Sequence, residues 1–79
     1  MPHVTLKMMA GRPEEKKQEL AQKLAQVVKD VIGSADASVS VAIFDIESDK
    51  WTSDVYDPEI VPNEDKLYKR PGYGSLASK

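Results

Sequence analysis

The chain has 79 residues, and its 11 basic and 13 acidic residues give a formal net charge of −2 at pH 7. Because the two signs are interspersed, the charge pattern gives no reason to expect nucleic acid or an anionic membrane as a partner. With no cysteine and one histidine, disulfides and thiolate or histidine-rich metal sites are excluded, so a domain this small is expected to gain stability by oligomerisation.

The first half of the sequence predicts a strand followed by a long helix. Residues 3–9 alternate between apolar and polar side chains, as a half-buried strand does. Pro13 is typical of a first helical position and Gly33 of the residue after a helix, which predicts a helix over about residues 13–32. One face of this helix is apolar, with the residues Leu20, Leu24, Val27, Val28 and Val31.

Residues 38–46 alternate again and are rich in β-branched side chains, which predicts a second strand. Strand, helix and strand form a β-α-β unit, whose strands are expected to be parallel with a right-handed crossover. A shorter helix is expected over about residues 59–69, with Pro62 near its start. Residues 51–56 form either a helical turn or a short extended segment. The fold class is therefore α+β, with a short C-terminal helix.

No linker or internal repeat divides the sequence, so residues 1–79 are interpreted as one domain, with a flexible tail over about 75–79. No stretch approaches 18 apolar residues, and the first residues lack the apolar region of a signal peptide. We therefore expect a cytoplasmic protein.

Two parallel strands and one helix cannot close a core, because both edges of such a sheet carry unpaired backbone groups. A second copy that adds its strands would enlarge the sheet to four. The predicted elements therefore favour a homo-oligomer.

Several motifs resemble the 4-oxalocrotonate tautomerase family. They are the beginning Met1-Pro2-His3, the Gly11-Arg12 pair before the long helix, and the strand sequence SVSVAI. The part from Trp51 to the LYKRPGY of residues 67–73 is similar to a longer, phenylpyruvate-tautomerase-like branch. The resemblance covers nearly the whole chain. It implies a β-α-β fold with subunits paired through their sheets, no cofactor, keto–enol tautomerisation of an α-keto acid, and a dimer rather than a hexamer.

Pro2 is the candidate catalytic base, provided that Met1 is removed. Proline is small enough for methionine aminopeptidase to cleave before it, and cleavage leaves a secondary amine. An apolar pocket and a nearby arginine both disfavour the charged amine, and we expect them to bring its pKa toward 7, where a general base works best. If Met1 remains, the Pro2 nitrogen is an amide and cannot act as a base.

By the same resemblance, three residues are predicted to contact the substrate. Arg12 matches the family's substrate-binding arginine and would grip a carboxylate; the alternative is a solvated surface arginine. Ser40 stands where the short members carry an arginine, which favours a monoacid over a dicarboxylate; the alternative is a polar strand residue without a role. Trp51 approximately matches an aromatic pocket residue and would form an apolar wall; the alternative is a core or interface tryptophan. His3 is not predicted to be a second acid–base group, because strand alternation directs adjacent side chains to opposite faces and would place its side chain on the face away from Pro2.

We therefore predict a tautomerase in which neutral Pro2 takes a proton from an enol hydroxyl or an α-carbon and returns it to the other site. Phenylenolpyruvate-like monoacids are the predicted substrate class, and no metal or cofactor is expected. Two alternatives remain open. One is another proline-dependent reaction on the same fold, such as dehalogenation, hydration or decarboxylation. The other is a non-catalytic dimeric interaction module.

Overall fold

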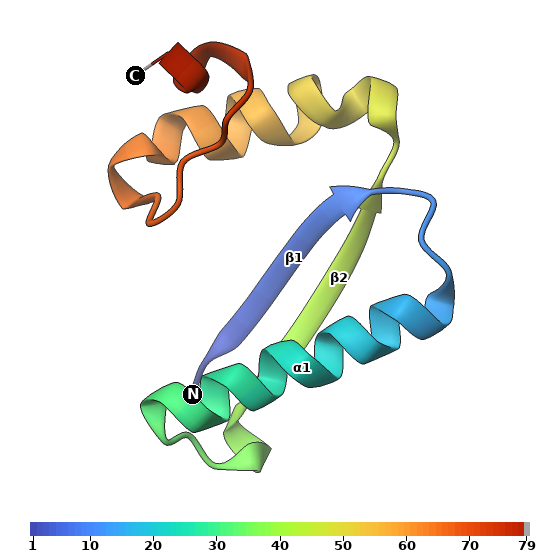
Figure 1. Ribbon diagram of the computed structural model, residues 1–79, viewed down its shortest axis with the longest axis vertical. Helices are drawn as coiled ribbons and strands as arrows, with labels where there is room; N and C mark the ends of the chain where they lie inside the picture. The colour runs from blue at the N-terminus through green and yellow to red at the C-terminus, as the bar shows by residue number, and fades with distance from the viewer. Residues whose placement is uncertain (79) are drawn as a thin grey trace. The chain divides into compact units, whose positions relative to one another are not determined.

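The computed structural model describes residues 1–78 and contains a β-α-β unit followed by a series of helical turns (Figure 1). The chain divides into two compact units after Ile46. The first unit holds β1 (His3–Met9), α1 (Glu14–Ile32), the short 3-10 helix η1 (Asp36–Ser38) and β2 (Ser40–Ile46). The second holds the 3-10 helix η2 (Ser48–Lys50), the π-helix η3 (Thr52–Ile60), and the 3-10 helices η4 (Val61–Lys66) and η5 (Gly74–Ser78).

The first unit confirms the predicted β-α-β fold. β1 and β2 pair in parallel, with His3 opposite Ser40 and Met9 opposite Ile46. α1 begins one residue after Pro13, whose extended backbone (ψ 155°) places it at the N-cap. The helix ends at Gly33, which adopts the left-handed conformation (φ 73°) and donates its N–H to the Lys29 carbonyl at 3.0 Å, as predicted for a glycine at this position.

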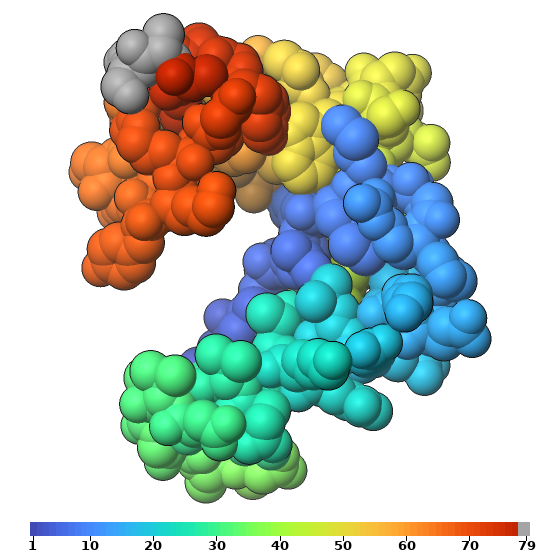
Figure 2. Space-filling view, viewed as in Figure 1, coloured from blue at the N-terminus to red at the C-terminus, as the bar shows by residue number. Residues whose placement is uncertain are grey.

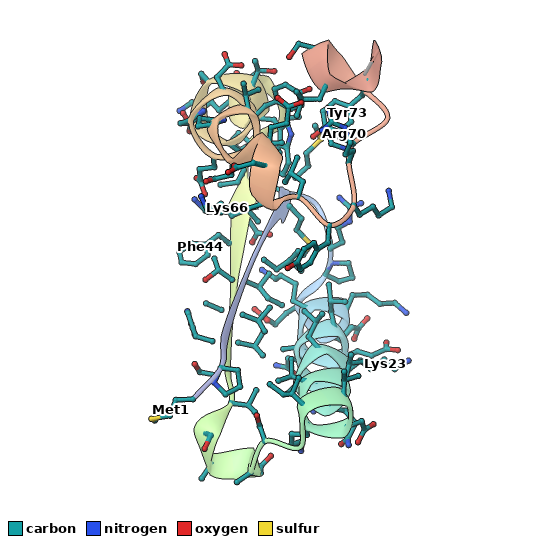
Figure 3. All side chains as sticks on the ribbon, turned by 90° about the vertical axis from the view of Figure 1, so that its left-hand side faces the viewer. Met1, Lys23, Phe44, Lys66, Arg70 and Tyr73 are labelled. Carbon is teal, nitrogen blue, oxygen red and sulfur yellow. The ribbon has the colours of Figure 1, made fainter. Side chains whose placement is uncertain are left out.

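The two faces of the sheet have different surroundings. Paired residues of parallel strands point to the same side, so alternate pairs face α1. Asp45 accepts a hydrogen bond from Lys17 of α1 at 2.7 Å, which identifies the helix side as the one that carries Val41 and Ile43. Figure 3 shows Phe44 on the other side of the sheet, away from α1. Within the first unit this second side, here called the open face, has no covering element. It carries His3, Thr5, Lys7, Met9, Ser40, Ala42, Phe44 and Ile46.

The predicted apolar stripe of α1 is wider than the sheet beneath it. Leu24 and Val28 are half-buried, whereas Val27 is 57% and Val31 is 76% exposed. In Figure 2 the surface of α1, cyan to green, faces the viewer, and no other element of the first unit covers it. No residue of 1–46, all of which the structure describes, is fully buried. The β-α-β unit therefore presents apolar surface both on α1 and on the open face.

The second unit differs from the prediction of a helix over 59–69. Helical turns begin already at Ser48 and end at Lys66; Pro62 lies in the first turn of η4, near its start as predicted, but η4 directly continues η3. Pro58, inside η3, lacks the N–H that an α-helical bond requires, and the segment adopts wider π-type turns. Such turns do not have the 3.6-residue period from which helices are predicted, which explains why the boundaries were wrong.

The chain end is anchored by an apolar side chain. Leu76 of η5 is 3% exposed, and its backbone N–H donates to the hydroxyl of the buried Tyr56 at 3.0 Å. Residues 75–78, assigned from the sequence to a flexible tail, thus lie in an ordered turn, and Lys79 lies outside the described residues. No helix in the described part of the chain is both long and apolar enough to cross a membrane.

Candidate functional site

Pro2 is held at the start of β1 by the neighbouring strand. Its carbonyl accepts a hydrogen bond from the Ser40 N–H at 3.2 Å, and the residue is half-buried. Met1 is fully exposed, and Figure 3 shows its side chain pointing away from the sheet. Met1 is thus exposed to solvent, next to a Pro2 whose carbonyl is bonded to β2.

Ser40 lies beside Pro2 and is engaged by a residue that the sequence reasoning left out. The Ser40 hydroxyl oxygen is 2.6 Å from Nδ1 of His3, and Nε2 of the same ring is 3.2 Å from the Thr5 hydroxyl oxygen. The strand register places His3 directly opposite Ser40, so the two side chains lie on the same face of the sheet. The signal that would have identified His3 is therefore the register, which periodicity alone does not give.

Arg12 lies on the loop that joins β1 to α1, at the other end of β1 from Pro2. Gly11 (φ 127°) precedes it, and its guanidinium donates to the Met9 carbonyl at 3.2 Å. It borders a shallow depression of 310 Å³ along α1, with Lys16 and Lys23 among the lining residues. The seven residues of β1 span about 23 Å at roughly 3.3 Å per residue. Within one chain the structure therefore brings Ser40, but not Arg12, to Pro2.

Trp51 belongs to the second unit, where it lies between η2 and η3. Its indole Nε1–H donates to the Tyr73 hydroxyl at 2.9 Å. Tyr73 is in turn fixed by Tyr56, whose hydroxyl donates to the Tyr73 carbonyl at 3.0 Å and whose ring lies 5.2 Å from the Tyr73 ring, centroid to centroid. The indole is half-buried. Trp51 is thus an oriented aromatic side chain in a small aromatic cluster.

Two charge pairs connect α1 to β2 and to the turn before β2. The hydrogen bond from Lys17 to Asp45 raises the pKa of the Lys17 ammonium, with a smaller contribution from the charge of Asp45 itself. The hydrogen bond from Lys29 at 2.8 Å lowers the pKa of Asp36, at the turn that leads into β2. Among residues 1–78, no three His, Asp or Glu side chains are placed to hold a metal ion.

Comparisons with known proteins identify a family for the chain. The family model described as "Tautomerase enzyme" matches residues 2–55, beginning at Pro2. A probable tautomerase of Xylella fastidiosa is 46% identical over 78 residues, covering 99% of this chain and 95% of that protein. Tautomerase PptA of Pectobacterium carotovorum is 46% identical over 74 residues, covering 92% of this chain and 97% of that protein. A solved 4-oxalocrotonate tautomerase isozyme from Methylibium petroleiphilum superposes with a TM-score of 0.62 at 28% identity, covering 63% of this chain and 81% of its own.

Proposed function

Since the chain belongs to the 4-oxalocrotonate-type tautomerase family and is a tautomerase, we propose that it interconverts the enol and keto forms of a small α-keto acid with Pro2 as general base. The observation that carries the proposal is the position of Pro2. Its backbone is tied to β2, it follows a fully exposed Met1, and the family model begins at this residue rather than at Met1. After loss of Met1, its secondary amine accepts a proton from the enol hydroxyl or the α-carbon and returns it to the other site.

Arg12 supports the proposal as the group that binds the substrate carboxylate, because a guanidinium remains charged and matches a carboxylate with two hydrogen bonds. Since about 23 Å of β1 separates Arg12 from Pro2 in one chain, the Arg12 that meets the substrate of a given Pro2 must come from a second copy. An antiparallel pairing of two sheets across a two-fold axis brings the Arg12 end of one β1 toward the Pro2 end of the other.

The substrate is proposed to be a monoacid of the phenylenolpyruvate type. Ser40, whose backbone N–H is bonded to the Pro2 carbonyl, carries a neutral hydroxyl, and such a group suits one uncharged oxygen better than a second carboxylate. Trp51 is proposed as the apolar wall that excludes water and stacks on an aryl group, and its indole is already oriented by Tyr73. A homodimer located in the cytoplasm, needing no cofactor, completes the proposal.

The assay is ketonisation of phenylenolpyruvate followed by absorbance, on protein whose intact mass shows that Met1 is gone. Pro2→Ala should lose most of the rate, because its primary amine is less well positioned, and the ascending limb of the wild-type pH–rate profile should disappear. Pro62→Ala is the matched control, since it makes the same change at an exposed proline of η4 that the proposal does not use. Wild-type activity in Pro2→Ala would place the base elsewhere. A product other than the keto acid would instead favour a hydration or decarboxylation reaction.

A mixing experiment tests the shared site. Pro2→Ala and Arg12→Ala are each expected to be nearly inactive, Arg12→Ala through weaker binding of the carboxylate by about 2–3 kcal/mol. In a random mixture of the two variants, half of the dimers are mixed and each holds one intact site, so about a quarter of wild-type activity should return. No recovery after subunit exchange would mean that Pro2 and Arg12 do not serve one substrate from different subunits.

A further inference from the structure

Three polar side chains form a row on the open face of the sheet. Thr5, His3 and Ser40 are linked by contacts of 3.2 Å from the Thr5 hydroxyl to Nε2 and 2.6 Å from Nδ1 to the Ser40 hydroxyl. Both contacts end on the same imidazole ring, which is therefore fixed at both of its nitrogens. The backbone of Ser40 simultaneously donates to the Pro2 carbonyl. The row thus ends on the residue whose backbone is bonded to the proposed catalytic residue.

The direction of the hydrogen bonds in this row decides what Ser40 can offer a ligand. A neutral imidazole donates from one nitrogen and accepts at the other. If the Thr5 hydroxyl donates to Nε2, then Nδ1–H donates to the Ser40 oxygen, and the Ser40 O–H is left to donate onward. In the opposite direction, the Ser40 proton is used on Nδ1 and the serine has only acceptor capacity left. A carboxylate or keto oxygen, which can only accept, requires the first arrangement.

We propose that His3 is a positioning residue that keeps the Ser40 hydroxyl oriented as a hydrogen-bond donor to an oxygen of the acid substrate. The inference rests on the proposed substrate contact at Ser40 and adds that Ser40 is the hydrogen-bond donor in that contact. The Thr5 hydroxyl donates to Nε2, which leaves the ring proton on Nδ1. Nδ1–H then donates to the Ser40 oxygen, so the Ser40 proton is free to point at the substrate. Ser40 and His3 therefore act as one donor unit in which neither residue is effective without the other.

A double-mutant cycle measures this dependence without measuring catalysis. The probe is 3-phenylpropanoate, a monocarboxylate that cannot be tautomerised, and its dissociation constant is measured by calorimetry at pH 8. Loss of one neutral hydrogen bond should weaken binding by about 5-fold in Ser40→Ala. His3→Leu should weaken it equally, and the double variant should be no weaker than either. His3→Asn, which keeps an N–H near the Nδ1 position, should restore most of the affinity. Losses that multiply, or no loss in His3→Leu, overturn the inference.

The tautomer itself gives a second test that needs no ligand. His3 is the only histidine of the chain, so the ring ¹⁵N spectrum at pH 8 contains a single imidazole. We expect the Nδ1–H form in the wild type and a shift toward Nε2–H in Thr5→Val. A wild-type ring in the Nε2–H form overturns the inference whether or not the probe binds. Since neither experiment uses the activity of Pro2, a failure of the proline mechanism stays distinguishable from a failure of this inference.

Discussion

The Tyr56 hydroxyl is the most informative single group to remove from the second unit. It donates to the Tyr73 carbonyl and accepts the Leu76 N–H, both at 3.0 Å. Tyr56 and Leu76 are 5% and 3% exposed, so water has little access to the Leu76 N–H, whereas Tyr73 is 48% exposed and its carbonyl is only partly buried. Tyr56→Phe keeps the ring but removes both hydrogen bonds at once. The change therefore isolates the contribution of one oxygen to the anchoring of the chain end.

The expected magnitude follows from what is left behind. A buried donor without a partner costs about 1–3 kcal/mol, and a lost hydrogen bond to a second group costs about 1 kcal/mol. We therefore expect Tyr56→Phe to lower the free energy of unfolding by about 2–4 kcal/mol. Because Tyr73 also orients the Trp51 indole, the Michaelis constant for an aryl substrate should rise as well.

The assay is urea unfolding followed by the fluorescence of Trp51, the only tryptophan of the chain. All variants are compared at one protein concentration, since assembly contributes to the measured stability. Tyr68→Phe is the matched control, because the same change is made at a tyrosine that is fully exposed; it should leave stability unchanged. If Tyr56→Phe is as stable as Tyr68→Phe, the two hydrogen bonds do not anchor the chain end and the reasoning is refuted.

Three further predictions concern the β-α-β unit. Gly33→Ala should lower stability by roughly 1 kcal/mol, a cost of backbone strain alone, because φ is 73° and an added Cβ meets no atom within 4 Å; an unchanged melting temperature would contradict it. Asp45→Asn should remove a stabilisation that the wild type retains at neutral pH. The hydrogen bond to Asp45 raises the pKa of Lys17 in the folded protein, so this stabilisation is fully present below pH 10.5, the ordinary pKa of a lysine. It is lost as the pH rises through the folded-state pKa. The two proteins should therefore converge in stability in strong alkali, and also at high salt because the Lys17 ammonium is solvent-accessible. Val31 is 76% exposed and lies in the last turn of α1, where a lysine is favourable for an isolated helix. Val31→Lys should therefore leave the helix intact, and a shift toward monomers in sedimentation equilibrium would show that this surface takes part in assembly.

The first unit was predictable from the sequence because its signals are local. Alternation over residues 3–9, the stripe of the helix and the glycine at its end each specify an element without knowledge of its neighbours. The second strand begins at Ser40 rather than at residue 38, because pairing starts only opposite His3 and residues 36–38 form a turn. Boundaries thus depend on the partner strand, which the sequence of one strand does not contain.

The second unit and part of the site depend on relations that periodicity does not encode. Val55 and Tyr56 are consecutive and both buried, which breaks the alternation of a strand, and they lie in a π-helix, whose period differs from the 3.6 residues of an α-helix. The pairing of His3 with Ser40 depends on register, and a slip of one residue would turn one of the two side chains to the other face of the sheet. The separation of Pro2 from Arg12, in contrast, could be predicted from the sequence, since the strand over residues 3–9 lies between them.

Both the stability of this chain and its proposed chemistry require association with a second copy. Its β-α-β unit has no fully buried residue, and it exposes apolar side chains both on α1 and on the open face. The proposed site likewise lacks an arginine until a second copy supplies Arg12. If one association meets both needs, dilution should reduce specific activity and thermal stability over the same range of protein concentration, and Val31→Lys should move both transitions to higher concentration together. A dilution series that combines the enzyme assay, thermal unfolding and sedimentation tests this coupling. Full activity in a sample that sediments as a monomer would break it, because a single chain holds Pro2 and Arg12 at opposite ends of β1.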